Sequence, residues 1–201
     1  MLEELVTQSL DLPSGELRLL QPRESADLPD DGEVEWAPVA PYWSVLWRSG
    51  VALARELDGV ELRGLRVVEL GCGLGVPSIA AERAGASVLA TDASQEALTL
   101  LARNAQANGA RIETATFDWT QPDQLLKRAP FDLVLAADVL YERGSVAPLL
   151  ALLPRLAPEA LLADPGRLAA GAFIEEAMRR GWQVETRSRD IVRIHRLRPL
   201  P

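Results

Sequence analysis

The nine residues Val67-Val68-Glu69-Leu70-Gly71-Cys72-Gly73-Leu74-Gly75 carry more information about this chain than any other segment of comparable length. They predict a short β-branched strand that ends in an acidic residue, followed by a glycine loop that opens a helix. Glycines let the backbone approach a ligand where a Cβ would clash. The free N–H groups at the start of the helix add a polar cradle. Taken alone, an ordinary strand-to-helix turn remains the alternative.

Two features of this loop argue against a phosphate-bearing ligand. The phosphate-binding pattern G-x-G-x-x-G, counted from Gly71, requires a glycine where the sequence has Val76. Glu69 precedes the first glycine by two residues, so its carboxylate would face the loop and repel a pyrophosphate. The loop therefore favours a neutral or cationic adenosyl ligand.

A second acidic residue lies about twenty residues beyond the first glycine, which is the spacing of a nucleotide-binding βαβ unit. The segment Ser87–Asp92 is predicted to be a strand that ends in this acid. In such a unit the carboxylate accepts hydrogen bonds from the ribose hydroxyls. Alone, Asp92 would be interpreted as a helix cap, since Ala93-Ser94-Gln95-Glu96 starts a helix. Glycine loop and acid together predict an adenosine-containing cofactor.

Size and composition indicate one globular unit without a membrane span. The 201 residues, 48% of them hydrophobic, suffice for a well-buried core. No apolar run reaches the roughly 18 residues that a spanning helix needs. The acidic start Met1-Leu2-Glu3-Glu4 lacks the pattern of a signal peptide. One cysteine, Cys72, excludes an internal disulfide and suits packing better than reactivity. We therefore expect a cytoplasmic location.

The formal net charge of −8 argues against nucleic acid as a partner, because such binding usually needs a basic surface. The same acidic surface leads us to expect a monomer. A basic strip near the C-terminus is more simply a solvated sheet edge; its members are Arg187, Arg189, Arg193, Arg196 and Arg198. The single histidine, His195, lies in an alternating strand pattern and is expected to be structural.

Predicted strands and helices alternate after Arg66, which is typical of a doubly wound α/β fold with helices on both faces of a parallel sheet. The closing strands, 182–189 and 191–198, are joined too tightly for a crossover and must be antiparallel. The other predicted strands are 66–70, 87–92, 112–117, 131–136 and 160–163, and the predicted helices are 76–84, 94–108, 123–128, 146–156 and 168–180.

The first 41 residues are predicted to form an extension of the domain at 42–201. Residues 5–10 and 16–20 flank a turn and predict a β-hairpin. Residues 21–41 are rich in Pro, Asp and Glu and predict a loop, whose length suggests a role over the active site. Residues 42–57 predict an amphipathic helix with one apolar face; that face contains Trp43, Leu46, Trp47, Gly50, Ala54 and Leu57.

A doubly wound sheet binds its ligand beyond the C-terminal ends of its strands, so the polar residues there are candidate site residues. This rim is acidic and contains neither lysine nor histidine, which suits a cationic ligand. Its members are Glu69, Gly71, Asp92, Asp118-Trp119, Asp138, Tyr141 and Asp164.

The motif Glu69-Leu-Gly-Cys-Gly-Leu-Gly75, together with Asp92 and the predicted strands, resembles the class I S-adenosylmethionine-dependent methyltransferases. That resemblance implies a Rossmann-like sheet of seven strands, mostly parallel with an antiparallel C-terminal strand. The segment Ala137-Asp138-Val139-Leu140-Tyr141 is similar to the D-x-x-Y motif of the seven-strand protein-lysine methyltransferases. The segments 41–47 and 163–167 are similar to the branch that methylates the β-subunit of electron-transfer flavoprotein.

The resemblance implies a role for each candidate residue toward S-adenosylmethionine or toward the methyl acceptor. Glu69, Gly71 and Gly73 would line the methionine side, and Asp92 would accept the ribose hydroxyls. Asp118 would meet the adenine amino group, with Trp119 packed on the ring. Trp47, whose alternative is core packing, and Ala137 complete the cofactor set. Asp138 and Tyr141 would orient the amine, with a helix cap and a surface aromatic as their alternatives.

Three functions remain open on the sequence alone. The first is methylation of a protein lysine, and the second is N-methylation of a small amine. The third groups a non-catalytic adenosyl-binding protein with a nicotinamide-dependent oxidoreductase. For an oxidoreductase we find no acid placed for hydride transfer, and no set of metal ligands is predicted. A non-catalytic binding protein would be expected to lose the acidic residues of the rim, whereas they are all present here.

Overall fold

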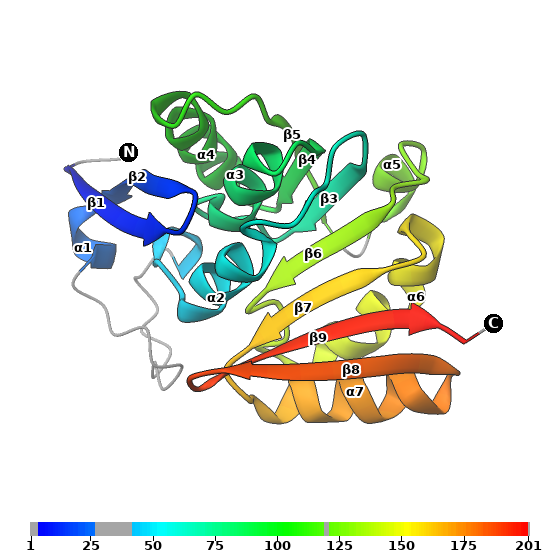
Figure 1. The fold of residues 1–201 in the computed structure, drawn as a ribbon. Coiled ribbons are helices and arrows are strands. Elements are labelled where there is room, and N and C mark those ends of the chain that lie inside the picture. The colour runs from blue at the N-terminus through cyan, green and yellow to red at the C-terminus, as the bar shows by residue number, and fades with distance from the viewer. Residues whose placement is uncertain (1–3, 27–41, 119–120, 201) are drawn as a thin grey trace.

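The structure, a computed structural model, describes residues 4–26, 42–118 and 121–200 (Figure 1). Within these residues a sheet of seven strands has the order β5-β4-β3-β6-β7-β9-β8. β9 runs antiparallel to its neighbours β7 and β8, whereas the pairings from β5 to β7 are parallel. The strands are β3 (Arg66–Leu70), β4 (Ser87–Asp92), β5 (Glu113–Thr116), β6 (Leu133–Ala137), β7 (Ala160–Asp164), β8 (Trp182–Arg189) and β9 (Val192–Pro199). The predicted fold class is confirmed.

Both faces of the sheet are covered by helices, because alternate residues of its central strands bury apolar side chains on opposite sides. Val67 packs into one core cluster and its neighbour Val68 into the other. The first cluster includes buried residues of α2 (Arg48–Leu57), α3 (Val76–Arg83) and α4 (Gln95–Ala107). The second includes residues of α5 (Asp123–Leu126), α6 (Val146–Leu156) and α7 (Leu168–Arg179). The predicted helix at 146–156 is confirmed to the residue.

The predicted hairpin is also confirmed, as β1 (Leu5–Leu12) and β2 (Gly15–Pro22). Its leucines, among them Leu17 and Leu19, join the core cluster of α2, α3 and α4. Figure 1 shows the pair lying beside α3 and α4 rather than in the main sheet. The predicted boundary between extension and domain at residue 41 stays a prediction.

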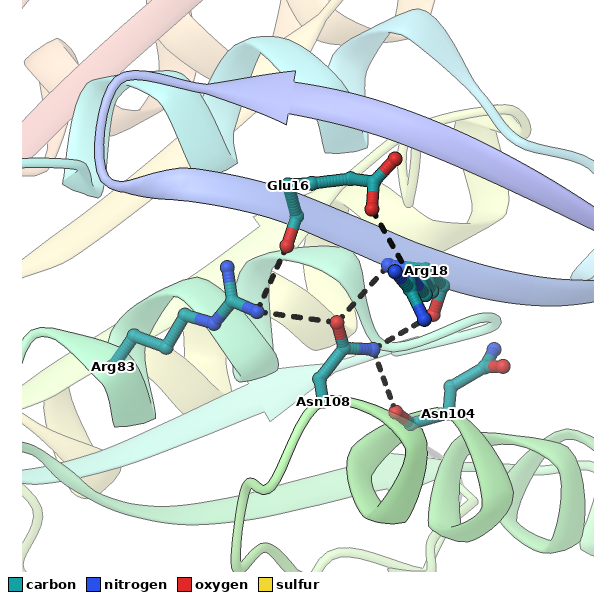
Figure 2. Close-up of polar contacts among 5 residues, drawn as sticks. All are labelled: Glu16, Arg18, Arg83, Asn104 and Asn108. Carbon is teal, nitrogen blue, oxygen red and sulfur yellow. Dashed lines mark hydrogen bonds and ion pairs between the residues drawn. The ribbon is translucent and has the colours of Figure 1, made fainter.

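Asn104 of α4 and Asn108, the residue that caps the C-terminal end of this helix, hold the outer edge of β2 (Figure 2). Asn108 Oδ1 accepts the N–H of Arg18 at 3.0 Å, and its Nδ2 donates to the Arg18 carbonyl at 2.7 Å. Asn104 Oδ1 accepts the N–H of Leu20 at 2.7 Å, and its Nδ2 donates to the carbonyl of Leu20 at 3.3 Å. Each side-chain amide therefore takes the place of a partner strand's peptide group.

The match between helix and strand spacing explains this arrangement. Four residues of a helix rise about 6 Å, and two residues of a strand rise about 6.6 Å. Asn104 and the C-cap residue Asn108, four residues apart, therefore meet alternate residues of β2. The amide of Asn104, which is fully buried, also donates to the carbonyl of Leu74 in the glycine loop at 3.1 Å. The hairpin is thereby tied to the loop that opens α3.

Two sequence expectations about the N-terminal third are corrected by the structure. The helix predicted over 42–57 begins at Arg48; it is preceded by a 3₁₀ turn, Tyr42–Ser44, and by Trp47 in an extended conformation. The Trp47 indole N–H donates to the Tyr42 carbonyl at 3.0 Å, which stabilises this turn in place of a longer helix. The loop predicted over 21–41 starts later, because β2 continues to Pro22 and a short helix, α1, spans Arg23–Ala26. Residues 27–41 lie outside the described residues.

Within the described residues, no helix has both the length and the apolar character that a membrane span requires. The C-terminal ends of β3, β4, β5, β6 and β7 meet at one edge of the sheet, since these strands are parallel. The candidate functional residues follow these ends.

Candidate functional site

A pocket of about 720 Å³ lies at this edge, between the glycine loop and the residues that precede α2. That volume lies within the usual range for small-molecule sites, about 300–1,000 Å³. Nine of the described candidates from the sequence line it: Trp47, Glu69, Gly71, Gly73, Asp92, Asp118, Ala137, Asp138 and Tyr141. Asp164, the remaining described candidate of the rim, does not line the pocket; its carboxylate accepts the N–H groups of Gly166 and Arg167 instead. Trp119 lies outside the described residues.

The glycine loop is packed closely against its neighbours, so a side chain at Gly73 would collide with backbone and one at Gly71 would be crowded. Gly71 and Gly73 both have positive φ, at 67° and 49°. A Cβ at Gly73 would lie 2.6 Å from the carbonyl oxygen of Trp43, and one at Gly71 would lie 3.0 Å from Val139. The sequence predicted that Gly73 allows close approach of a ligand. In the structure Gly73 also allows close approach of the Trp43 backbone, in the turn before α2.

Asp92 connects the glycine loop to the start of α4. Its Oδ2 accepts the N–H of Gly73 at 3.0 Å, and its Oδ1 accepts the N–H of Ser94 at 2.9 Å. Ser94 is itself the N-cap of α4 and accepts the N–H of Ala97 at 3.2 Å. Each carboxylate oxygen retains a further lone pair, so Asp92 can brace the loop and still accept two hydroxyl groups from a ligand in the pocket.

Glu69 is buried, with 1% of its surface exposed, although it lines the pocket. The Ser78 hydroxyl donates to the Glu69 carboxyl. The Ser78 N–H donates to it as well, because an N–H in the first turn of α3 has no partner within the helix. Burial raises the pKa of Glu69 to about 8, and the charge of Asp92 adds to the rise. At neutral pH the group is therefore mostly uncharged, so Glu69 repels an anion less than the sequence argument assumed.

The end of β5 supplies an apolar and an acidic side chain to the pocket. Phe117 is buried, and its N–H donates to the Asp92 carbonyl at 2.9 Å. Asp118, which follows it, is exposed at the rim. The sequence analysis missed Phe117, although it directly precedes the acidic-aromatic pair that was singled out.

Asp138 follows β6, whereas Asp118 follows β5, and two strands lie between β5 and β6 in the sheet. Asp138 is a non-glycine residue with positive φ, 56°, a conformation that tends to occur at functional sites. Its Oδ1 accepts Arg167 Nη2 at 3.0 Å and Nε at 3.4 Å. Burial raises the pKa of Asp138, opposed by the Ser49 hydroxyl and by Arg167.

Arg167 is the residue that the sequence analysis did not assign to the site. Among the described residues that line the pocket, it has the only cationic side chain. Its guanidinium lies 5.9 Å from the centre of the Trp47 ring, within cation–π range. The rim is therefore acidic but carries one cationic side chain, an arginine rather than a lysine or histidine.

Tyr141 is half-exposed at the mouth of the pocket. Partial burial raises the pKa of its phenol, and the charges of Glu142 and Asp92 add to this rise. The phenol is therefore a neutral hydrogen-bonding group at neutral pH. Trp47 lines the pocket and precedes α2, so it is not part of the apolar face of that helix; its place at the cofactor stays a prediction.

The features set aside in the sequence analysis are structural. His195 is buried on β9 and shares a 2.8 Å hydrogen bond with Thr186, and burial lowers its pKa. Cys72 is buried, and burial raises the pKa of its thiol. Members of the arginine strip form ion pairs with two glutamates: Arg187 and Arg189 with Glu56, and Arg196 and Arg198 with Glu159.

These residues fit S-adenosylmethionine. The carboxylate of Asp92 has two free lone pairs for ribose hydroxyls, and Asp118 offers an acceptor to an amino group. Arg167 is already paired with Asp138, which leaves no described cation in the pocket lining to bind a phosphate. The donor set thus suits an adenosyl ligand that carries a positive charge and no phosphate.

Comparison with known structures supports this fold. A methyltransferase for magnesium protoporphyrin IX from Synechocystis, solved with the bound cofactor, has a TM-score of 0.60 at 24% identity, covering 75% of this chain and 77% of that one. A 16S rRNA N2 G1207 methyltransferase from T. thermophilus has a TM-score of 0.65 at 18% identity, covering 98% of this chain and 51% of that one. At these identities the likeness concerns the fold alone.

Sequence comparison identifies the family. The electron transfer flavoprotein β-subunit lysine methyltransferase of Mus musculus is 34% identical, covering 77% of this chain and 62% of the relative. The histidine protein methyltransferase 1 homolog of Dictyostelium discoideum is 36% identical, covering 50% of this chain and 34% of the relative. The chain spans 34 to 64% of the length of the first curated relatives that it matches. A family profile described as "Lysine methyltransferase" matches residues 42–162. The chain therefore belongs to the lysine methyltransferase family.

Proposed function

We propose that this protein transfers a methyl group from S-adenosylmethionine to the side-chain nitrogen of a lysine in another protein. The main support is one pocket that joins a glycine loop and Asp92 to a second carboxylate, Asp138, inside the family's matched region. Relatives of this chain include an electron transfer flavoprotein β-subunit lysine methyltransferase and a protein N-lysine methyltransferase, both of Mus musculus.

When bound, S-adenosylmethionine supplies a methyl group on a positively charged sulfur, and the C–S bond breaks as the amine lone pair forms the N–C bond. In this proposal Asp92 holds the ribose hydroxyls and Asp118 the adenine amino group, with Trp119 on the ring. Glu69, Gly71, Gly73, Trp47 and Ala137 line the remainder of the cofactor. Asp138 and Tyr141 orient the incoming amine. Most of the acceleration then comes from proximity and alignment.

The acceptor amine must be neutral to react, whereas a free lysine has a pKa of about 10.4. A carboxylate close to the amine favours the ammonium form. We therefore assign Asp138 to binding and orientation, and the amine proton is lost to water. This assignment predicts a rate that rises with pH above neutrality.

Histidine is a second candidate acceptor, because a histidine protein methyltransferase homolog is among the relatives. An imidazole has a pKa of about 6.5 and is already mostly neutral at pH 7. A histidine acceptor therefore predicts a rate that levels off above pH 7, in contrast to the continued rise for lysine. N-methylation of a small amine remains the alternative that involves no protein substrate.

The test is incubation of the protein with a cell lysate and S-adenosylmethionine that carries a labelled methyl group. The lysine proposal predicts a labelled protein band that yields methyl-lysine on hydrolysis. Methyl-histidine in that band would select the second candidate. Label confined to small molecules would contradict both. The variant Asp138→Ala is the control, since it should leave the band unlabelled.

We also propose a cytoplasmic monomer that does not bind nucleic acid. The net charge of −8 supports the absence of nucleic-acid binding. Light scattering at micromolar concentration should give the mass of one chain, 21.9 kDa. A stable dimer would contradict the monomer.

A further inference from the structure

Arg167 is held at the acceptor end of the pocket by two carboxylates from neighbouring strands. Its Nη2 lies 3.0 Å from Asp138 Oδ1, and its Nε lies 3.9 Å from Asp164 Oδ2. The side chains of Asp138 and Asp164 are 7% and 2% exposed, and that of Arg167 is 21% exposed. An arginine between two buried carboxylates is a fixed charge of the site rather than a mobile surface group.

The turn after β7 aims this arginine at the pocket. Asp164 Oδ1 accepts the N–H groups of Gly166 and Arg167, both at 2.7 Å, which bends the chain back toward the end of β6. Gly166 permits the bend because its φ is 98°. The guanidinium then lies against the Trp47 ring, which restricts it on a second side. Backbone and aromatic contacts together fix the direction of the side chain.

The charges around Arg167 balance. Asp138 faces it from β6, and Asp164 faces it from β7. Arg193 of β9 is the register partner of Asp164 and acts on its carboxylate. From the start of α2, Trp47 and Ser49 contribute no charge, and the Tyr141 phenol is neutral. The charges of two carboxylates and two guanidinium groups therefore cancel around Asp138 and Arg167. Glu142, beside Tyr141 in the pocket lining, adds one negative charge outside this group.

The balance of charge around Asp138 matters for the reaction proposed above. An opposite charge within about 4–6 Å raises the pKa of an amine by about 1–3 units, which would reduce the reactive fraction at least tenfold. A guanidinium in contact with the same carboxylate offsets that field. It also leaves the second oxygen of Asp138 to accept a hydrogen bond from the amine. The ion pair is thus compatible with orientation of the amine without retention of its proton.

We propose that Arg167 is a positioning residue, whose ion pair with Asp138 aligns that carboxylate and prevents it from holding the incoming amine as an ammonium ion. The inference rests on the proposed methyltransferase function and assigns to this arginine a role at the same site. It predicts that loss of Arg167 increases the affinity of the site for a cationic amine relative to a neutral ligand.

The test compares two cofactor analogues by calorimetry at pH 7.5. S-adenosylhomocysteine lacks the transferred methyl group, whereas sinefungin carries a charged amine in that region. In Arg167→Gln the affinity ratio of sinefungin to S-adenosylhomocysteine should rise about tenfold, since the carboxylate charge is no longer offset. Arg167→Lys keeps the charge and should stay near the wild-type ratio. Arg63→Gln, at an arginine whose side chain is 82% exposed, is the matched control and should not change it.

Asp138→Asn provides a second variant with the opposite sign. Loss of the carboxylate leaves Arg167 as an excess cation, so the same ratio should fall about tenfold. If Arg167→Gln does not fold, this variant decides the question alone. An unchanged ratio in Arg167→Gln, or a shift of both variants in one direction, would overturn the role of Arg167. Failure of the wild type to bind either analogue would instead contradict the proposed function.

Discussion

The cofactor end and the acceptor end of the pocket both place a carboxylate at the end of a parallel strand, but they stabilise it by different means. Asp92 is held by two backbone N–H groups, with hydrogen bonds from Gly73 and Ser94. Asp138 is held by the guanidinium of Arg167. Backbone donors position a carboxylate and leave its charge in place, whereas a guanidinium also neutralises it. The same residue type thus suits a neutral hydroxyl at one end and an amine that must lose its proton at the other.

The largest expected effect concerns the acceptor end. Asp138→Ala should lower the rate of methyl transfer about a hundredfold or more, because the amine loses its alignment. Affinity for S-adenosylhomocysteine should change little. An activity assay on the labelled band, run beside calorimetry, measures both. Full activity in this variant would remove the D-x-x-Y resemblance as support for lysine methylation.

At the cofactor end, Asp92→Ala should lower cofactor affinity at least tenfold. Hydrogen bonds to a charged acceptor contribute about 1.5–3 kcal/mol each, and a factor of ten corresponds to about 1.4 kcal/mol. Calorimetry with S-adenosylhomocysteine measures the loss, and Asp92→Asn tests whether the charge is required. Wild-type affinity in Asp92→Ala would show that the ribose is held elsewhere.

A third prediction uses the buried acid between the two ends. The pKa of Glu69 is raised on folding, from its ordinary value to about 8. Its unfolded form ionises first, so stability without ligand falls as pH rises toward 8. Between pH 6 and 8 the loss is about 2 kcal/mol. Glu69→Gln cannot ionise and should lack this loss. Parallel melting curves of wild type and variant across this pH range would contradict the burial argument.

The smallest effect is expected where the hairpin meets the glycine loop. Asn104→Ala leaves the N–H of Leu20 and the carbonyl of Leu74 without their side-chain partner. The cost is about 1–2 kcal/mol, or a fall in melting temperature of about 2–8 °C for a chain of this length. Asn108→Ala, at the less buried site four residues on, is the matched control and should cost less. Equal losses of stability in the two variants would contradict the expectation that the buried asparagine contributes more than the partly exposed one.

Local patterns in the sequence were sufficient for the sheet, the hairpin and most of the pocket. Apolar runs marked β3, β4, β6 and β7. Parallel strands bring their ends together, which is why nine of the described candidates share one pocket. The helix predicted from Tyr42 failed because the apolar spacing at Trp43, Leu46 and Trp47 matched a helix. These residues instead form a turn that lines the pocket, stabilised by the hydrogen bond from the Trp47 indole to the Tyr42 carbonyl.

What the sequence did not reveal depends on contacts between distant residues. Arg167 reaches Asp138 because the Asp164 carboxylate turns the backbone, and no local periodicity encodes that bend. The raised pKa of Glu69 follows from burial under α3, which a strand pattern does not specify. The asparagine clamp joins residues 84 and 90 positions apart. Each of these features needs the three-dimensional arrangement.

Thermal melting of the wild type, Asp92→Ala and Asp138→Ala with S-adenosylhomocysteine, which carries no charge at the sulfur, tests the separation of the two ends most directly. At about 100 times the wild-type dissociation constant, binding stabilises the wild type by about 2.7 kcal/mol. That corresponds to a rise of about 5–10 °C. Asp138→Ala should show the same rise and Asp92→Ala about half of it, while NAD should shift none of the three. Loss of the rise in Asp138→Ala to the same extent as in Asp92→Ala, or an equal rise with NAD, would contradict the account.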